Sequence, residues 1–267
     1  MLGTLAAKAT DVPIRIGGLR VAESRPLRCR VERYAAERMT SLVCVSRAVQ
    51  AFAGTALQCD PPKSIVIPNS VNVTRFVTAQ PMLWSTLGWP DDSAVTLFVG
   101  RLHPQKGIDL LQASLDTLAP SESNRRLLLV GDGPLRDELE TWAKVVGHDR
   151  VQIMPWQKDV APIIKASGLL ILPSRYEGMP NVVLEAMATG KPVVCSRVEG
   201  SEELMSHAKE QQSFALDDVA QMKRLAEQIL SDESLGEELG HQNLQRVKAD
   251  FSIPAMVDRY RSHYRSF

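Results

Sequence analysis

The sequence predicts an α/β protein with one complete Rossmann-like domain, built on a parallel sheet, and a partial Rossmann-like domain before it. From residue 93 onward, short apolar runs alternate with longer amphipathic segments, which is typical of stacked β-α units. The apolar runs are almost free of polar residues, as expected for strands buried on both faces. Before residue 86 only three short strands can be recognised. We therefore expect a partial domain at 1–85, a complete domain at 86–250 and a closing helix at 251–267.

The first 85 residues contain three candidate strands and two candidate helices. One helix is expected over Leu27–Met39, and another begins after Ser46, whose hydroxyl is a good N-cap. Thr78–Ser93 is the expected linker to the second domain. The strands are expected at Ile14–Gly17, Leu42–Val45 and Ile65–Ile67.

The second domain alternates strands and helices in the order that a parallel sheet requires. Its helices carry apolar residues at helical spacing. A closing helix is expected over Ile253–Tyr264, with Pro254 in its first turn. The expected strands are Val95–Val99, Leu127–Val130, Val151–Met154, Leu169–Leu172 and Pro192–Cys195. The expected helices are Gly107–Leu118, Leu135–Val146, Val160–Ala166, Val182–Thr189, Val219–Leu230 and Leu235–Lys248.

Charge and composition exclude several classes of protein. The chain has 31 basic and 31 acidic residues, so its overall field gives no reason to expect a nucleic-acid partner. The four cysteines form no C-x-x-C pair, which argues against a zinc site or a disulfide framework and fits a cytoplasmic protein. No apolar window approaches the 18 residues of a spanning helix.

One region departs from this charge balance. Seven arginines lie between residues 20 and 47, and a solvated helix face is the simplest interpretation. Contact with an anionic acceptor, or with the inner face of the membrane, is the alternative. The arginines are Arg20, Arg25, Arg28, Arg30, Arg33, Arg38 and Arg47.

The most informative segment places two carboxylates, Glu177 and Glu185, eight residues apart around the start of a helix. That helix follows a predicted strand, and open parallel sheets bind ligands at the carboxyl ends of their strands. With Asn181 as the N-cap, the N–H groups of residues 182–184 are expected to be free to bind an anion such as a diphosphate. Glu177 and Glu185 could then accept hydrogen bonds from hydroxyls on opposite sides of that diphosphate. A nucleotide sugar has this layout.

A second cluster follows the first strand of the same domain. Arg101 and Lys106 lie in the short loop Gly100–Gly107, where both cations can converge on the phosphates. Fixed cations stabilise a departing diphosphate as its negative charge grows. No Asp-x-Asp occurs in the chain, so we expect that no metal is needed.

A third segment, Leu127–Arg136, contains a glycine turn between a strand and a helix. Arg136 occupies the third glycine position of a dinucleotide fingerprint, and no acidic residue closes the next strand. We interpret Gly131 and Gly133 as structural, because glycines permit a tight bend between strand and helix.

Together these segments resemble the retaining glycosyltransferases of the group 1, or family 4, type, which have the GT-B fold. The E-x7-E spacing from Glu177 to Glu185 is the most specific feature, and Ile67–Asn72 is a weaker one. The other matching segments are Val99–Gly107, Leu129–Pro134 and Pro173–Gly178.

The resemblance implies transfer of a sugar from a nucleotide-diphosphate sugar to an acceptor hydroxyl, with retention at the anomeric carbon and no cofactor. The acceptor would be a glycan or a lipid-linked sugar. Glu177, Arg101 and Lys106 would be catalytic, and Trp156–Asp159 would lie near the nucleobase. The donor-binding residues would be Gly100, Arg101, Lys106, Glu177, Gly178, Asn181, Val182, Val183 and Glu185.

Two departures from the family pattern bear on activity. The family has two full Rossmann domains, so the partial first domain indicates an N-terminally shortened protein. The family also carries a histidine in its N-terminal domain, whereas the first histidine here is His103, and Arg20 stands where a counterpart is expected. A nucleotide-sugar-binding module without catalysis is therefore the alternative, and a sugar-nucleotide epimerase is a less favoured one.

Overall fold

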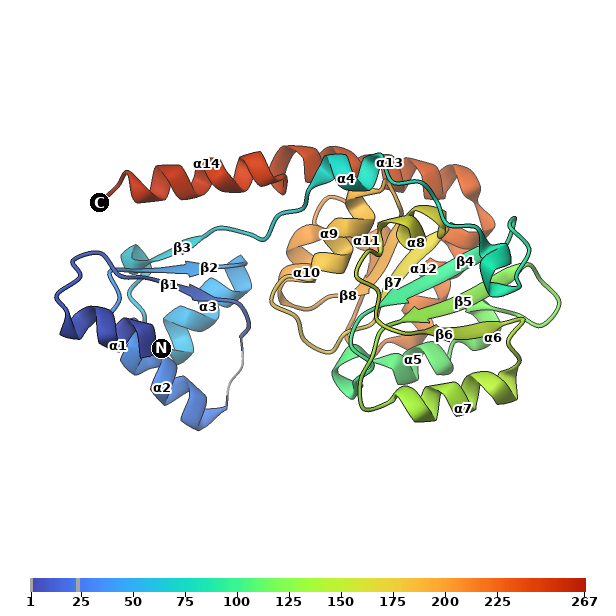
Figure 1. The fold of residues 1–267 in the computed structure, drawn as a ribbon, viewed down its shortest axis with the longest axis horizontal. Helices are drawn as coiled ribbons and strands as arrows, with labels where there is room; N and C mark the ends of the chain where they lie inside the picture. Colours follow the sequence, from blue (N-terminus) through green and yellow to red (C-terminus); the bar gives the residue numbers. More distant parts are fainter. Residues whose placement is uncertain (1, 23–24) are drawn as a thin grey trace.

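The computed structural model describes residues 2–22 and 25–267, which form two units, each built on a parallel sheet (Figure 1). The first sheet has three strands in the order β1-β2-β3, and the second has six in the order β6-β5-β4-β7-β8-β9. The second order is that of a doubly wound fold, whose direction reverses between β4 and β7. Ligands bind at such a reversal, so the topology alone points to the loops that follow β4 and β7.

Helices and strands alternate along the first unit. Ser46 caps α3 as expected, because its hydroxyl accepts a hydrogen bond from the N–H of Val49 at 3.2 Å. The first strand begins two residues later than expected. The elements are α1 (Leu2–Ala9), β1 (Ile16–Leu19), α2 (Pro26–Ala36), β2 (Ser41–Cys44), α3 (Arg47–Ala56) and β3 (Ser64–Val66).

The second unit contains the remaining strands and most of the helices. Its strands are β4 (Ala94–Val99), β5 (Arg125–Val130), β6 (Val151–Met154), β7 (Leu169–Leu172), β8 (Val193–Ser196) and β9 (Ser213–Phe214). Its helices are α4 (Val73–Val77), α5 (Ile108–Gln112), α6 (Leu115–Leu118), α7 (Arg136–Val146), α8 (Ala161–Ala166), α9 (Asn181–Ala188), α10 (Glu199–Leu204), α11 (Lys209–Gln212), α12 (Val219–Ser231) and α13 (Glu233–Asp250). The last helix, α14 (Ile253–Tyr264), follows the second unit in the chain.

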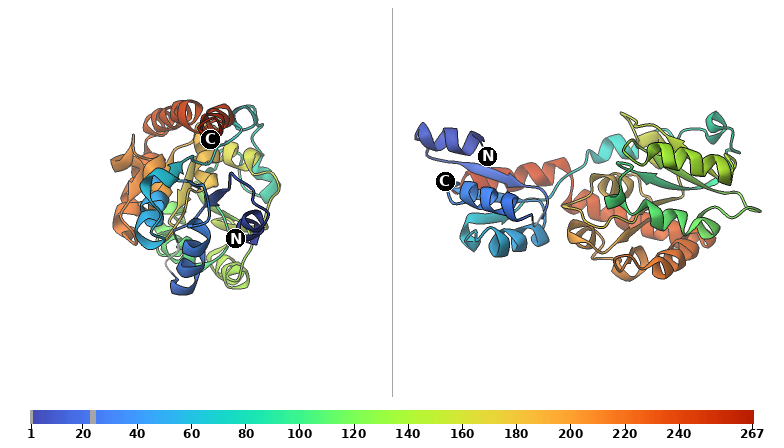
Figure 2. Two further views of the ribbon diagram at one scale, coloured as in Figure 1. Left: turned by 90° about the vertical axis from the view of Figure 1, so that its left-hand side faces the viewer. Right: turned by 90° about the horizontal axis from the view of Figure 1, so that it is seen from below.

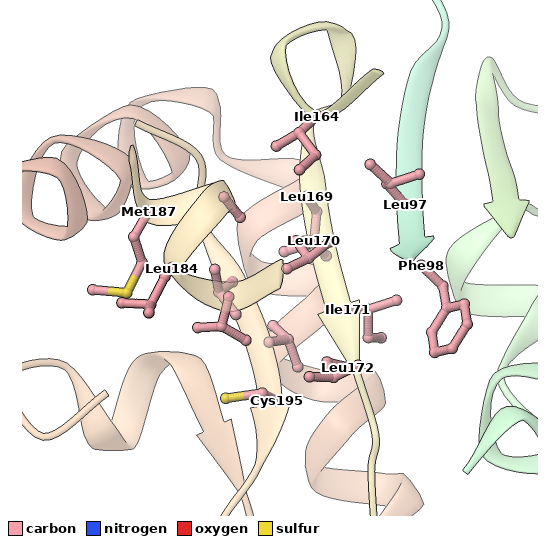
Figure 3. Packing of buried hydrophobic residues seen from close by; sticks show 14 of the residues in the cluster. Leu97, Phe98, Ile164, Leu169, Leu170, Ile171, Leu172, Leu184, Met187 and Cys195 are labelled. Carbon is pink, nitrogen blue, oxygen red and sulfur yellow. The ribbon is translucent and has the colours of Figure 1, made fainter. Parts of the chain in front are cut away.

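The central strands of the second sheet are buried on both faces. Leu97 and Phe98 of β4 and all four residues of β7 are at most 1% exposed. Figure 3 shows α9, with Leu184 and Met187, beside the buried side chains of β7 and Cys195 of β8, and all of these residues belong to one buried cluster. Burying a large apolar side chain stabilises the fold by about 1.5–3 kcal/mol. This core therefore holds the end of β7 and the start of α9 rigidly together.

One predicted helix and one predicted linker differ from the structure. The helix expected over Gly107–Leu118 is broken into α5 and α6, because Ser114 leaves the helical conformation with a fully buried side chain. The linker expected at Thr78–Ser93 is packed onto the second unit. Trp84 and Trp89 within it are 2% and 3% exposed, and the Trp89 indole N–H donates to the His148 carbonyl at 2.7 Å.

The chain crosses between the units at residues 67–72 and again at the start of α14. The two crossings lie side by side, since the Val71 N–H donates to the Phe251 carbonyl at 3.0 Å. From there α14 extends along the first unit (Figures 1 and 2), where the Ser41 hydroxyl lies 2.9 Å from Nε2 of His263. The closing helix has the predicted bounds, Ile253–Tyr264, and joins the two units.

Candidate functional site

The carboxyl ends of the strands in the second sheet face the first unit (Figure 1). Here the loop after β4 and the loop after β7 lie against each other. The Arg175 N–H donates to the Gln105 carbonyl at 2.8 Å, and the Gln105 side chain donates to the Tyr176 carbonyl at 2.9 Å. Gly107 has a φ of +64°, and a Cβ there would collide with the Pro173 carbonyl. The two loops are therefore held together by backbone contacts that a larger residue would prevent.

Two side chains from these loops converge on the Glu177 carboxylate. Lys106 forms an ion pair with its Oε1, and the Ser174 hydroxyl donates to the same oxygen at 2.7 Å. The Glu177 and Lys106 side chains are only 11% and 17% exposed. Within the described residues, the other carboxylate oxygen of Glu177 has no hydrogen-bond partner and can accept from a ligand. Lys106 and Glu177, which the sequence placed in the same donor site, are thus in direct contact.

The start of α9 differs from the prediction. Pro180, in an extended conformation, is the N-cap, and Asn181 is the first helical residue. The N–H groups of Val183 and Leu184 both donate to the Pro180 carbonyl, at 3.2 and 3.4 Å. The expectation that these two groups are free was wrong, because the proline carbonyl already accepts from them. Within the described residues, the N–H groups of Asn181 and Val182 remain available for an anion.

Glu185 lies one turn further along α9, away from Glu177. The pKa of its carboxyl is raised, mainly by burial. The nearby charge of Arg75 opposes this shift, and that of Asp159 adds to it. Arg75 and Asp159 form an ion pair of 2.9 Å beside it. The structure therefore places the two glutamates in separate surroundings, Glu177 in the loop before α9 and Glu185 within the helix.

Arg101 lies in a pocket of about 400 Å³ at the ends of β4 and β5. The pocket wall includes Trp156, which is 66% exposed, and Gln157. Arg101 is exposed, and no ion pair involving it is formed within residues 2–22 and 25–267. The structure thus brings Arg101 together with the segment that the resemblance placed near a nucleobase. Lys106, by contrast, is directed to Glu177.

The glycine turn after β5 has a structural role, as the sequence indicated. A Cβ at Gly131 would collide with the Gly100 carbonyl, and a Cβ at Gly133 with the Leu102 carbonyl. Both glycines therefore allow the backbone after β5 to lie in contact with the backbone after β4. Gly100 itself lies at the rim of the Arg101 pocket.

Glu199 is part of the site although sequence reasoning did not select it. It is the first residue of α10, and its carboxylate accepts a hydrogen bond from the Glu177 N–H at 2.9 Å. Burial raises the pKa of the Glu199 carboxyl, and this hydrogen bond lowers it. The signal that could have identified Glu199 is its place just after β8, at the same edge of the sheet as Glu177.

Two residues from outside the second sheet also reach the site. Gly178 packs against Arg20 of the first unit, since a Cβ at Gly178 would collide with the Arg20 carbonyl. Asn69, in the crossing segment, donates to the side-chain oxygen of Asn181 at 2.9 Å. Neither contact can be inferred from sequence spacing, because the partners lie far apart along the chain.

Several properties of the described residues concern metals, thiols and membranes. No cluster of three His, Cys, Asp or Glu side chains in this part of the chain is arranged to hold a metal ion. All four cysteines are free thiols. Of the helices described, none is both long enough and apolar enough to cross a membrane. Whether the reaction needs a metal stays a prediction.

Solved structures confirm the fold. HepE of Anabaena, crystallised with UDP, superposes with a TM-score of 0.87 at 21% identity over 100% of this chain and 76% of its own. WaaG, a glycosyltransferase involved in lipopolysaccharide biosynthesis, gives a TM-score of 0.73 at 20% identity over 94% of this chain and 80% of its own. The chain therefore has the GT-B arrangement of two Rossmann-like units.

Several relatives are similar in sequence. One is the UDP-Gal:alpha-D-GlcNAc-diphosphoundecaprenol alpha-1,3-galactosyltransferase of Escherichia coli, 27% identical over 99% of this chain and 72% of the relative. Another is the lipopolysaccharide core biosynthesis glycosyltransferase LpsE of Rhizobium meliloti, 31% identical over 73% of this chain. The chain spans only 56% of LpsE. The family model for glycosyl transferases group 1 matches residues 93–232, more than half of the 267 residues. The chain belongs to this family, the group 1 glycosyltransferases.

Proposed function

We propose that the chain transfers a sugar from a nucleotide-diphosphate sugar to an acceptor hydroxyl, with retention of configuration at the anomeric carbon. The observation that carries this proposal is the convergence of Lys106 and Ser174 on the Glu177 carboxylate, next to the free N–H groups that begin α9. A cation and helix N–H groups bind a diphosphate, and a carboxylate oxygen beside them accepts from sugar hydroxyls.

Each group has a defined task in this reaction. The bond between the anomeric carbon and the β-phosphate oxygen breaks, and negative charge collects on the departing phosphate. Lys106 and Arg101 stabilise this charge, together with the N–H groups of Asn181 and Val182. The acceptor oxygen forms the new bond on the same face of the sugar, and its proton passes to the departing phosphate oxygen. No side chain is required as a nucleophile.

Three arguments support retention. The family resemblance implies it, and two relatives carry an alpha-linked product in their names, an alpha-1,3-galactosyltransferase and an alpha-D-kanosaminyltransferase. In addition, Glu177 already accepts from Lys106 and Ser174, so its carboxylate is arranged to bind hydroxyls and not to activate a water or an acceptor. The nucleoside would extend from the start of α9, with its ribose at Glu185 and its base beside Trp156 and Gln157, in the pocket that Arg101 borders.

A transfer assay tests the proposal. The chain is incubated with UDP-, GDP- and ADP-sugars and simple acceptors, and the anomeric configuration of the product is read by proton NMR. Inversion would reject the mechanism. Nucleotide binding without turnover would favour the non-catalytic module, and interconversion of donor epimers without an acceptor would reveal an epimerase.

The acceptor is proposed to be a lipid-linked sugar, as the name of the Escherichia coli relative states for that protein. Helix α2 offers a surface for contact with an anionic membrane. Leu27 and Tyr34 are 76% and 49% exposed on it, and Arg30 and Arg33 are exposed beside them. Apolar side chains flanked by arginines are typical of helices that lie in the lipid headgroup layer.

Vesicle co-sedimentation tests this contact. The chain should bind phosphatidylglycerol vesicles at low salt, bind phosphatidylcholine vesicles poorly, and lose binding in the double variant Arg30→Glu/Arg33→Glu. Equal binding to both lipids, or no effect of the charge reversal, would reject α2 as the contact surface.

A further inference from the structure

Arg20 lies at the boundary between the two units, directly opposite the loop that carries Glu177. It follows β1, whose carboxyl end faces the second unit (Figure 1). Its carbonyl is in contact with Gly178, the residue after Glu177, at a distance that leaves no room for a Cβ. The backbone of Arg20 is therefore fixed beside the site even though it belongs to the first unit.

The Arg20 side chain is held at the start of α9 by Asn69. Its Nη1 donates to the Asn69 side-chain oxygen at 2.6 Å. The amide nitrogen of Asn69 donates in turn to Asn181 at 2.9 Å and to the Met179 carbonyl at 3.2 Å. Because Asn69 contacts both Arg20 and the first residue of α9, it positions the guanidinium near the free N–H groups of that helix.

The charge of Arg20 is not neutralised by the protein. Its side chain is exposed, and within the described residues no carboxylate pairs with it. Two other arginines of the second unit, in contrast, have acidic partners: Arg75 pairs with Asp159 and Arg175 with Asp109. A guanidinium has five donors, and Asn69 accepts from only one of its nitrogens. The remaining donors are available to an anion bound at the start of α9.

We infer that Arg20 is a further catalytic residue, which contacts the β-phosphate of the donor nucleoside diphosphate bound at the start of α9. This inference rests on the proposed function. As the bond from the anomeric carbon to the phosphate oxygen breaks, the electron pair remains on the phosphate, and Arg20 stabilises that charge. The first unit then completes the donor site, and donor turnover depends on the two units being held together at Gly178.

The decisive experiment compares a nucleoside diphosphate with its monophosphate. Isothermal titration calorimetry is performed with UDP, GDP and ADP, and then with the monophosphate of the tightest binder. Arg20→Gln should weaken diphosphate binding by roughly tenfold, the usual effect of losing a hydrogen bond to a charged group, and should leave monophosphate binding unchanged. The diphosphate affinity of Arg20→Lys should lie between those of wild type and Arg20→Gln, because lysine keeps the charge but loses the planar, bidentate geometry of the guanidinium.

Two further variants complete the design. Arg224→Gln removes the same charge from an exposed position on α12 and should change neither affinity. Asn69→Ala removes the side chain that holds Arg20 in place. It should therefore cause part of the loss of diphosphate affinity expected for Arg20→Gln. Equal diphosphate affinity in wild type and Arg20→Gln would overturn the inference while leaving the proposed function intact. Failure of the wild-type chain to bind any of the three diphosphates would overturn both.

Discussion

Lys106 is ion-paired with Glu177 in a site that is nearly closed to solvent, since the two side chains are 17% and 11% exposed. The pair joins the loop after β4 to the loop after β7, where the direction of the sheet reverses. A buried pair is costly to break, because removing one partner leaves the other charge without compensation. The pair therefore has a structural role and, in the proposed reaction, a chemical one.

Lys106→Met is expected to lower kcat by roughly 10²- to 10³-fold, the effect of removing one fixed group that stabilises transition-state charge. It should also lower the thermal midpoint of unfolding, because Glu177 loses its cation. Steady-state kinetics and thermal unfolding measure the two effects. Lys144→Met, an exposed position on α7, is the matched control and should be unchanged. A variant with wild-type kcat would contradict the proposed role of Lys106.

Glu185→Gln tests the buried carboxylate on α9. Burial raises the pKa of Glu185 above its ordinary value of 4.5, so the folded protein holds this proton more tightly than the unfolded chain does. The contribution of this carboxyl to stability is then fully present below pH 4.5 and is lost as the pH rises through the window between the unfolded and folded pKa values. The glutamine variant cannot ionise. It should be more stable than wild type at neutral pH, and the difference should disappear in acid.

The same variant should bind nucleoside diphosphates more weakly, because an ionised carboxylate is the better acceptor for paired ribose hydroxyls. Glu122→Gln, in an exposed loop, serves as the control for both measurements. Chemical denaturation across pH and calorimetry with UDP separate the two effects. Unchanged affinity would remove Glu185 from the proposed ribose site, and a loss of stability at neutral pH would show that its carboxylate has a favourable partner.

The sequence predicted the second sheet well, and the reason is visible in β6 and β7, whose bounds match the prediction. Strands buried on both faces are short, continuous apolar runs, and no other element of this fold has that pattern. The loops at their carboxyl ends could therefore be selected as the site from the order of these runs along the chain. The short strand β9 has only two residues and was missed.

The parts of the site that could not be predicted depend on contacts between distant segments. Asn181 has the residue type of a good N-cap, yet Pro180 takes that position and the Asn181 side chain accepts from Asn69 instead. Arg20 and Glu199 are brought to Glu177 only by the packing of the first unit and of α10. A local pattern indicates which residues can bind a ligand, but tertiary packing decides which of them reach it.

Trp84→Ala should destabilise the second unit by about 3–5 kcal/mol, the range for truncating a buried aromatic side chain. Trp84 lies in the segment expected to be a linker, is 2% exposed and packs 6.3 Å from Trp89 between ring centroids. Leu83→Ala, next to it and 60% exposed, is the matched control and should have little effect. Urea denaturation measures both. A small loss for Trp84→Ala would restore the linker interpretation.

Gly178→Ala should reduce turnover by separating the two units. A Cβ at Gly178 collides with the Arg20 carbonyl, so the first unit must move away from the loop that carries Glu177. Gly54→Ala in α3 is the control, since no heavy atom lies closer than 4.0 Å to a Cβ there, and in a helix it should stabilise by roughly 0.5–1 kcal/mol. Small-angle scattering should show a larger radius of gyration for Gly178→Ala alone. The collision can be relieved only if one of the two backbones moves. Wild-type turnover and dimensions in Gly178→Ala would therefore show that the reaction does not need contact between the units at this glycine.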